Sequence, residues 1–227
     1  MTRKTKHTTT PKEVRDGRHR GGVQDRTQRV SVRKVVVSEF VSVDGVVEDP
    51  GWTFQFGSGE QEKYKFAELA ASDALLLGRV TYEGFAAAWP NMMNQYEGPR
   101  RAELQEYTDM MNGYPKYVVS TTLEEPLGWN NSTLIRRNVA EEVSELKRQP
   151  GKDILVFGSA YLVNELVRHD LIDELRLMVF PIVVGSGKRL FEDGLKESVL
   201  RLVDTSTFGS GVVVLTYRPA RDDGENG

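Results

Sequence analysis

Runs of consecutive apolar residues alternate along the chain with segments in which apolar residues recur every three or four positions. The runs predict strands, the first of which begins at Val35 and ends at the Asp44-Gly45 turn, followed by short strands over 74–77, 116–120 and 154–157. The segments with helical spacing predict helices over 66–70, 81–89, 101–111, 139–146 and 161–168. This alternation is typical of an α/β domain whose central sheet is mostly parallel and flanked by helices.

The C-terminal part of the chain follows a different pattern. Strand-like segments cover 175–184, 199–208 and 212–217, and the last two are separated only by Gly209-Ser210-Gly211. A short glycine-rich connection of this kind predicts an antiparallel hairpin, so the sheet is expected to be mixed. No repeat or linker interrupts 31–218, and we expect a single domain there.

The two ends of the chain differ from this body. Residues 1–30 carry nine Lys and Arg against three Asp and Glu, and only four apolar residues, which predicts a disordered basic tail. Such an arm could contact nucleic acid, but no aromatic residue accompanies the charges, so a solvated extension or an upstream translation start is the preferred interpretation and nucleic acid is not an expected partner. Residues 219–227 are expected to form a second, polar tail.

Composition excludes several classes of protein. The 227 residues include no cysteine and three histidines, two of which lie in the basic tail, so disulfides, thiolate chemistry and structural zinc are excluded and no metal site is expected. The longest apolar run, 177–184, is broken by Pro181 and falls well short of the ~20 residues of a membrane helix. Residues 1–10 lack the apolar segment of a signal peptide, so we expect a cytoplasmic protein without a membrane partner.

Small and hydroxyl residues follow three of the predicted strands at the point where each strand ends. These strand exits are Gly78-Arg79-Val80-Thr81, Ser120-Thr121-Thr122 and Gly158-Ser159-Ala160. Each by itself is more often a turn or a helix cap than a ligand site. Glycine permits close backbone approach, however, and helix N-termini and hydroxyl groups at strand ends suit phosphate. The three together predict an extended, multiply phosphorylated ligand such as a dinucleotide.

The order of several motifs along the chain resembles that of a known family. The motifs are Val41-Ser42-Val43-Asp44-Gly45, Leu76-Leu77-Gly78-Arg79-Val80-Thr81, Tyr117-Val118-Val119-Ser120-Thr121-Thr122, Val156-Phe157-Gly158-Ser159-Ala160, Leu171-Ile172-Asp173-Glu174-Leu175 and the segment from Pro181 to Phe191. Over 33–217 the chain is similar to the dihydrofolate-reductase-like superfamily, and within it to the branch of the C-terminal reductase domain of riboflavin biosynthesis, the RibD C-terminal family.

This resemblance implies an NADPH-dependent reductase, commonly a homodimer, acting on a small-molecule substrate. It assigns the adenosine-side phosphates to Gly78, Arg79 and Thr81, the ribose 2′-phosphate to Ser120 and Thr121 with Arg79, and the pyrophosphate to Gly158, Ser159 and Ala160. It also places Asp44 and Gly45 beside the nicotinamide and Trp52 at the side of the substrate pocket. Cationic and hydroxyl donors favour NADPH, because the ribose of NAD usually meets an acidic residue.

One departure from the family pattern limits what the resemblance implies. Folate reductases carry a substrate-binding carboxylate on the first helix, and Glu60, Glu62 and Glu68 offer no clear match, so a folate substrate is not expected and the catalytic residue stays unassigned. We therefore expect reduction of a small heteroaromatic or carbonyl-like compound. The alternative is a nucleotide-binding or sensing protein that keeps the coenzyme groove without turnover. Asp44 either assists protonation or is simply the turn residue before Gly45, and the second interpretation is preferred.

Overall fold

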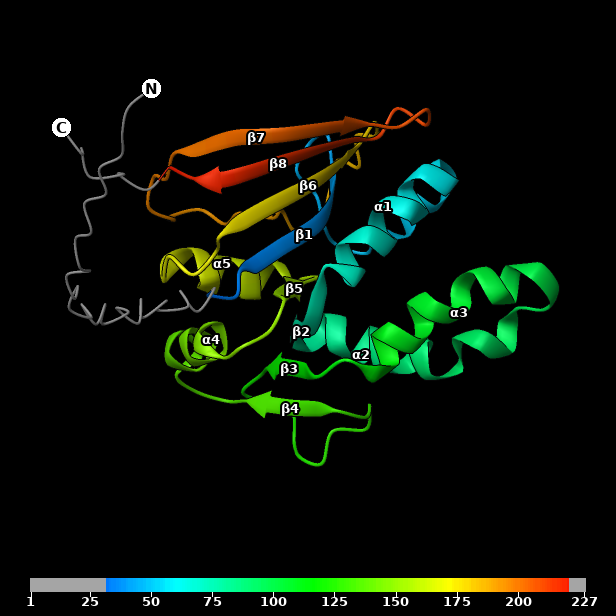
Figure 1. Ribbon diagram of the computed structural model, residues 1–227. Helices are drawn as coiled ribbons and strands as arrows, with labels where there is room; N and C mark the ends of the chain where they lie inside the picture. Colours follow the sequence, from blue (N-terminus) through cyan, green and yellow to red (C-terminus); the bar gives the residue numbers. More distant parts are fainter. Residues whose placement is uncertain (1–31, 221–227) are drawn as a thin grey trace, which may run out of the picture. The chain divides into compact units, whose positions relative to one another are not determined.

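A single mixed sheet carries the helices and loops of the domain (Figure 1). The computed structural model describes residues 32–220, so the predicted basic tail and residues 221–227 lie outside the described part. The strands are β1 (Val35–Ser42), β2 (Ser72–Gly78), β3 (Lys116–Val119), β4 (Ser132–Ile135), β5 (Asp153–Val156), β6 (Glu174–Phe180), β7 (Leu200–Thr207) and β8 (Val213–Pro219). The α-helices are α1 (Gly59–Ala70), α2 (Arg79–Ala88), α3 (Gly98–Gly113), α4 (Val139–Arg148) and α5 (Ala160–Arg168), and the 3₁₀ segments are η1 (Pro50–Phe56) and η2 (Trp89–Gln95).

The strand order places the predicted strand exits along one edge. The eight strands follow the order β4-β3-β2-β5-β1-β6-β8-β7. The pairs from β4 to β6 are parallel, whereas β8 pairs antiparallel with both β6 and β7. This confirms the mixed, mostly parallel α/β sheet with its C-terminal antiparallel hairpin. Because parallel strands all end at the same edge, the loops that follow β2, β3, β5 and β1 are neighbours there.

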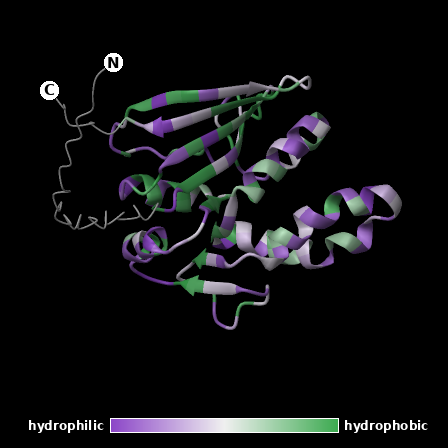
Figure 2. Cartoon of the chain, viewed as in Figure 1, coloured by the Kyte–Doolittle hydropathy of each residue, from purple (hydrophilic) through white to green (hydrophobic). Residues whose placement is uncertain are grey.

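Alternating side chains of the central strands fill a core on each face of the sheet. On β1, Val35 and Val37 pack with α4 and α5, while Val36 packs on the other face with residues of α1, α2 and α3. The central strands are accordingly apolar on both faces, and Figure 2 shows them hydrophobic beside helices that mix polar and apolar positions. No helix among residues 32–220 has both the length and the apolar character needed to cross a bilayer.

The structure differs from the sequence-based expectation at three strands. β4 was not predicted, because it has only four residues, lies at the sheet edge and is partly exposed, so it carries no clear apolar pattern. β6 ends at Phe180 instead of continuing to residue 184, since Pro181 has no backbone N–H for the ladder. β8 continues through Pro219, two residues beyond the predicted end of the last strand.

Candidate functional site

Strand register brings together the residues that follow β2, β3 and β4. Gly78 pairs with Val119, and Val119 pairs with Ile135. The next residues, Arg79, Ser120 and Arg136, therefore leave three adjacent strands at the same level. Arg136 is exposed and was missed in the sequence because β4 itself was missed. This corner of the sheet edge thus carries two arginines and a serine at the ends of adjacent strands.

The loops that follow β2 and β5 interlock through glycines. The Gly78 N–H donates to the Gly158 carbonyl at 2.9 Å. A Cβ on Gly78 would lie 2.9 Å from the Ser159 nitrogen, and a Cβ on Gly158, whose φ is +95°, would lie 3.1 Å from Thr81 Oγ1. Both positions therefore need glycine, because the two loops lie too close together for a side chain at residue 78 or 158.

The same two loops begin helices α2 and α5. Neither Gly78 nor Ser159, the residues that precede these helices, caps them with a side-chain hydrogen bond. The first backbone N–H groups of each helix, including that of Ala160, therefore lie at the sheet edge and receive no hydrogen bond from a capping side chain. With Thr81 between the loops, the geometry can accept an anionic group such as a pyrophosphate.

At the outer end of this edge, several of the predicted side chains already have protein partners. The exposed Arg79 guanidinium contacts the Glu83 carboxylate at 2.9 Å, one helical turn away. Ser120 Oγ accepts the N–H groups of Thr122 and Leu123 at 3.1 and 3.0 Å and lies 3.4 Å from Thr122 Oγ1, and these contacts shape the turn. Thr121 is exposed beside it.

Asp44 stabilises the loop at the end of β1. Its carboxylate accepts hydrogen bonds from Ser42 Oγ at 2.7 Å, from the Val184 N–H at 3.0 Å and from the Gly185 N–H at 2.9 Å. These hydrogen bonds, led by that from Ser42, lower the pKa of Asp44 to about 2. Asp44 is thus ionised at neutral pH, which fits the turn-residue interpretation, while Gly45 follows it with a φ of +85°.

Trp52 lies in an aromatic cluster near the same end of the sheet. Its indole N–H donates to the Glu48 carbonyl at 3.1 Å, and its ring meets the Phe180 ring edge-on with centres 5.6 Å apart. Phe40 and Phe56 complete the contacts to Phe180. These contacts account for Trp52 as a packing residue, and its place at the side of the substrate pocket stays a prediction.

Glu39 is a buried acid beside the loops that follow β2 (78–81) and β5 (157–160), here called the glycine loops, and it belongs to none of the predicted site motifs. Its residue surface is 8% exposed, and Oε1 has no hydrogen-bond partner. A Cβ atom on Gly158 would lie 3.3 Å from Glu39 Oε1. Burial, partly offset by the positive charge of Lys65, raises the pKa of Glu39 to about 8. The sequence did contain a signal, since a glutamate interrupts an otherwise apolar central strand.

A charged network lies on the other face of β1, under α1. Lys65 Nζ donates to Ser38 Oγ at 2.9 Å and to Glu68 Oε2 at 2.6 Å, and it lies 4.3 Å from the centre of the Phe157 ring. Glu68 also accepts from Ser38 at 3.0 Å and from Arg176 at 3.4 Å. Glu68, one of the three acids considered for substrate binding, is therefore buried and satisfied within the protein.

Cavities open on the described part of the domain at two places that bear on the site. One, of about 950 Å³, lies between α1 and α3 and is lined by residues that include Lys65, Phe66, Trp89, Arg100 and Tyr107. Lys65, which lines this cavity, also lies against the ring of Phe157, the residue before Gly158. Aromatic walls with a few charged groups suit a flat polar molecule.

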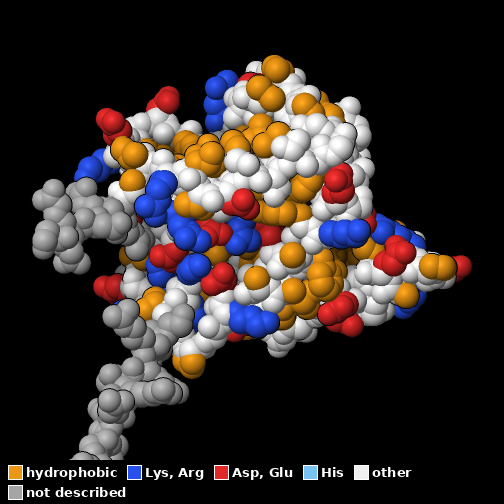
Figure 3. Space-filling model, turned by 45° about the horizontal axis from the view of Figure 1, so that its top comes forward, with side chains coloured by type: hydrophobic (Ala, Val, Ile, Leu, Met, Phe, Trp, Pro, Cys, Tyr) orange, Lys and Arg blue, Asp and Glu red, His pale blue; other side chains and the backbone are white. Residues whose placement is uncertain are grey.

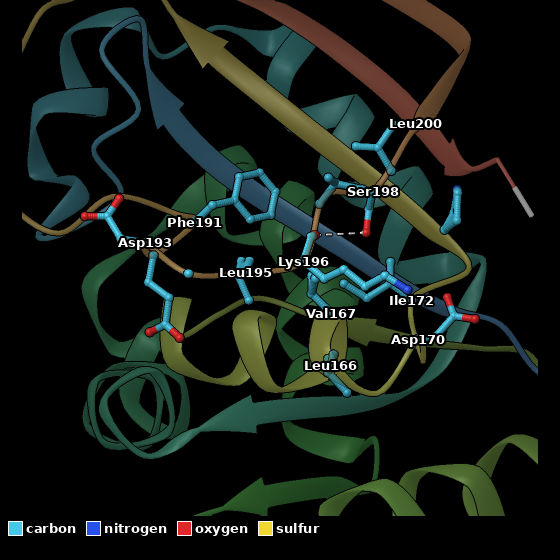
Figure 4. A pocket seen from close by; sticks show the side chains of 14 residues that line it. Leu166, Val167, Asp170, Ile172, Phe191, Asp193, Leu195, Lys196, Ser198 and Leu200 are labelled. Atoms are coloured by element: carbon cyan, nitrogen blue, oxygen red, sulfur yellow. Dashed lines mark hydrogen bonds between the residues drawn. The ribbon is translucent and has the colours of Figure 1, made fainter.

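The other cavity, of about 390 Å³, lies beside α5 and the segment that leads into β7 (Figure 4). Leu166 and Val167 of α5 face Phe191 and Leu195 across it, and Ser198 Oγ donates to the Lys196 carbonyl at 3.3 Å. None of the predicted site residues lines this cavity. Within residues 32–220, no group of three His, Asp or Glu side chains is arranged to hold a metal ion.

Comparison with known proteins gives concordant matches. The model of the RibD C-terminal domain matches residues 33–214. The protein YyaP of Bacillus subtilis (strain 168), described as uncharacterised, is 31% identical over 191 residues, which cover 84% of this chain and 97% of YyaP.

Solved structures share the fold at lower identity. The riboflavin biosynthesis reductase Rib7 of Saccharomyces cerevisiae superimposes with a TM-score of 0.52 and 20% identity, covering 86% of this chain and 93% of that one. A dihydrofolate reductase from Enterococcus faecalis, in a complex with NADP(H), gives a TM-score of 0.51 and 12% identity over 83% of this chain and 97% of that one. These likenesses establish a dihydrofolate-reductase-like fold.

Proposed function

The chain belongs to the RibD C-terminal domain family, of dihydrofolate-reductase-like fold, and from that premise we propose that it is an NADPH-dependent reductase of a small heteroaromatic or carbonyl-like substrate. The observation that carries the proposal is the close meeting of the β2 and β5 loops, where Gly78 and Gly158 leave no room for a side chain beside two helix N-termini. NADPH, when bound, supplies the hydride. The protein's own task is to bind, orient and exclude water.

The residues present fit a dinucleotide phosphate. Gly78, Gly158, Ser159, Ala160 and Thr81 would hold the pyrophosphate with backbone N–H and hydroxyl donors. At the outer corner, the ribose 2′-phosphate would meet Arg79, Ser120 and Thr121, and we add Arg136, which strand register places next to Ser120. Asp44 and Gly45 would border the nicotinamide end through the loop that they shape.

The cavity between α1 and α3 is the proposed substrate site. Lys65 lines this cavity and lies against Phe157, so it stands between the substrate side and the coenzyme side. Ser38 and Glu68 use two of the three Nζ–H groups, which leaves one to bind a carbonyl oxygen or ring nitrogen of the substrate. Trp89 and Tyr107 offer flat apolar walls for a heteroaromatic ring.

A binding assay followed by a substrate screen tests the proposal. Purified protein is titrated with NADPH and with NADH while nicotinamide fluorescence is followed, and NADPH consumption is then measured with oxidised pterins, pyrimidines and aldehydes. We expect NADPH to bind more tightly than NADH and at least one acceptor class to be reduced. Failure of both coenzymes to bind would refute the function.

The same assay separates the alternative, a sensing protein without turnover. A sensor would bind NADPH and oxidise it with none of the acceptors. The cavity beside Lys65 favours the reductase, because a sensor needs no substrate space of about 950 Å³ next to the coenzyme loops. A Lys65→Met variant that binds NADPH normally but raises KM for the best acceptor would support the substrate site.

We also propose that the protein is a homodimer formed through β7. This edge strand is exposed along most of its length, and Leu200, Leu202 and Val203 present 37%, 50% and 38% of their surfaces to solvent. Figure 3 shows hydrophobic side chains gathered over this edge of the sheet. An unpaired edge strand with apolar side chains is a surface that a second copy can cover.

A further inference from the structure

We propose that Glu39 is a coenzyme-binding residue whose carboxylic acid form donates its proton to a pyrophosphate oxygen of the bound nicotinamide dinucleotide, so that coenzyme binding retains or takes up a proton. The inference rests on the proposed function and adds a residue and a pH dependence that neither the motifs nor the relatives assign.

Strand register opens the sheet beside Glu39. β1 pairs with β5 only as far as Val37 and Val156, whereas on its other side β1 pairs with β6 as far as Ser42 and Phe180. Beyond Val37, the β5 side of β1 therefore faces the loop that contains Gly158 instead of a paired strand. Glu39 is the second residue beyond this point, at the level of the glycine loops.

The Glu39 carboxyl is directed at those loops. A Cβ on Gly158 would lie 3.3 Å from Glu39 Oε1, 3.6 Å from Oε2 and 3.1 Å from Thr81 Oγ1, so the missing side chain of Gly158 leaves the acid and the hydroxyl around one small space. Oε1 is buried and has no hydrogen-bond partner within the described residues. A buried oxygen of this kind carries a free-energy cost that a ligand at this position would remove.

Burial favours the neutral form of Glu39, and the charges around it offset this only in part. Lys65 of α1 is the charged group that acts on it, and this lysine is already paired with Glu68. From α2, Thr81 faces Glu39, while Arg79 is exposed and paired with Glu83.

On β6, Arg176 pairs in register with Ser38, so it belongs to the opposite face of the sheet, where Glu68 and Glu174 bind it. In the loop before α5, Ser159 follows Gly158 and carries an uncharged hydroxyl group. At the end of β1 itself, Asp44 is held by the 184–185 backbone. Lys65 therefore remains the compensating cation, and burial raises the pKa of Glu39 to about 8.

A neutral carboxyl in this position can donate to phosphate, whereas an ionised one would repel it. Bound phosphate raises the proton affinity of Glu39 further, so affinity for the coenzyme must fall as the free protein loses this proton. With a pKa of about 8 in the free protein, linkage predicts that the Kd for NADPH rises about tenfold between pH ~7 and pH ~9. At pH ~8.5 binding should take up roughly three quarters of a proton, and at pH ~7 roughly a tenth.

Calorimetry measures this proton directly. NADPH is titrated into the wild-type protein at both pH values in two buffers of different ionisation enthalpy, and the difference in heat gives the number of protons taken up. Glu39→Gln keeps a neutral donor, so it should bind NADPH within about twofold of wild type at pH ~7, show almost no proton uptake and lose the pH dependence. Glu145→Gln, which removes an exposed acid paired with Arg148 on α4, should behave as wild type.

The outcomes separate the two proposals. Wild-type protein that binds NADPH without proton uptake at pH ~8.5 overturns the role of Glu39 and leaves the reductase proposal intact, a result that needs no variant. Uptake that persists in Glu39→Gln assigns the proton to another group, such as Lys116, whose pKa burial lowers to about 8, and also overturns the inference. Wild-type protein that binds neither coenzyme refutes both proposals.

Discussion

The contact between the β2 and β5 loops makes Gly78→Ala an informative perturbation. The φ of Gly78 is −77°, which alanine adopts without strain, so any effect comes from the added methyl group. That methyl group would lie 2.9 Å from the Ser159 nitrogen and 3.1 Å from the Ser159 Cβ, well inside ordinary van der Waals contact. The loop at the start of α5 must move away from α2 to accept it.

The structure sets the expected magnitude. Overpacking of this kind costs about 1–3 kcal/mol of unfolding free energy. The displaced loop also loses alignment of donors to the coenzyme phosphates, and one charge-assisted hydrogen bond is worth about 1.5–3 kcal/mol. We therefore expect affinity for NADPH to fall at least tenfold, together with the loss of stability.

The matched control lies on the same helix. Gly84 is in the interior of α2, and a Cβ there meets nothing within 4 Å, so Gly84→Ala should raise the free energy of unfolding by about 1 kcal/mol through helix propensity alone. Adding Ser159→Gly to Gly78→Ala removes the Ser159 side chain, which makes no cap hydrogen bond, and should recover part of both losses.

Urea unfolding and NADPH fluorescence titration measure the two effects. Gly78→Ala should unfold at lower urea than wild type and bind NADPH more weakly, whereas Gly84→Ala should unfold at higher urea and bind normally. If Gly78→Ala matches wild type in both assays, the loops do not approach as closely as the structure shows, and the argument for a phosphate site between them fails.

Three further substitutions test other parts of the structure. Arg79→Ala should weaken NADPH binding by about 1–3 kcal/mol and NADH binding much less, because a charge-assisted contact to the 2′-phosphate is lost; equal losses in the fluorescence titration would contradict that role. Lys116→Met should lower the free energy of unfolding, measured in urea, by about 3 kcal/mol while NADPH binding persists, because Lys116 Nζ donates to three backbone carbonyls at 2.9, 2.7 and 3.3 Å. Unchanged stability would refute this role of Lys116. Leu202→Glu should convert a dimer to a monomer in light-scattering measurements without loss of secondary structure, and a dimer that persists would exclude the β7 surface.

The sequence by itself determined the elements whose signals are local. Helices α2 to α5 and the buried strands β2, β3 and β5 follow from apolar spacing and from the turn residues that bound them. The glycines at 78 and 158 were recognisable because they follow neighbouring predicted strands together with hydroxyl residues, although each alone is more often a turn or a cap. The ordered motifs then pointed to the family that the comparisons establish for residues 33–214.

Only the tertiary structure decided which of these residues are neighbours. β4 is too short and exposed to be read from its own residues, and its pairing with β3 is what brings Arg136 beside Ser120. Asp44 accepts a hydrogen bond from the Val184 backbone 140 residues away, a contact that the sequence could not show. Contacts over such separations are set by strand order, which no local pattern encodes.

Burial was the second property that the tertiary structure decided. Glu39 and Lys65 are ordinary charged residues in the sequence, and their chemistry changes because one is enclosed beside the glycine loops and the other is held between a carboxylate and the Phe157 ring. A pKa responds to the dielectric and charges around a group, which exist only once the strands and helices have packed. The sequence therefore singled out the loops that follow β2 and β5, and packing decided which titratable groups adjoin them.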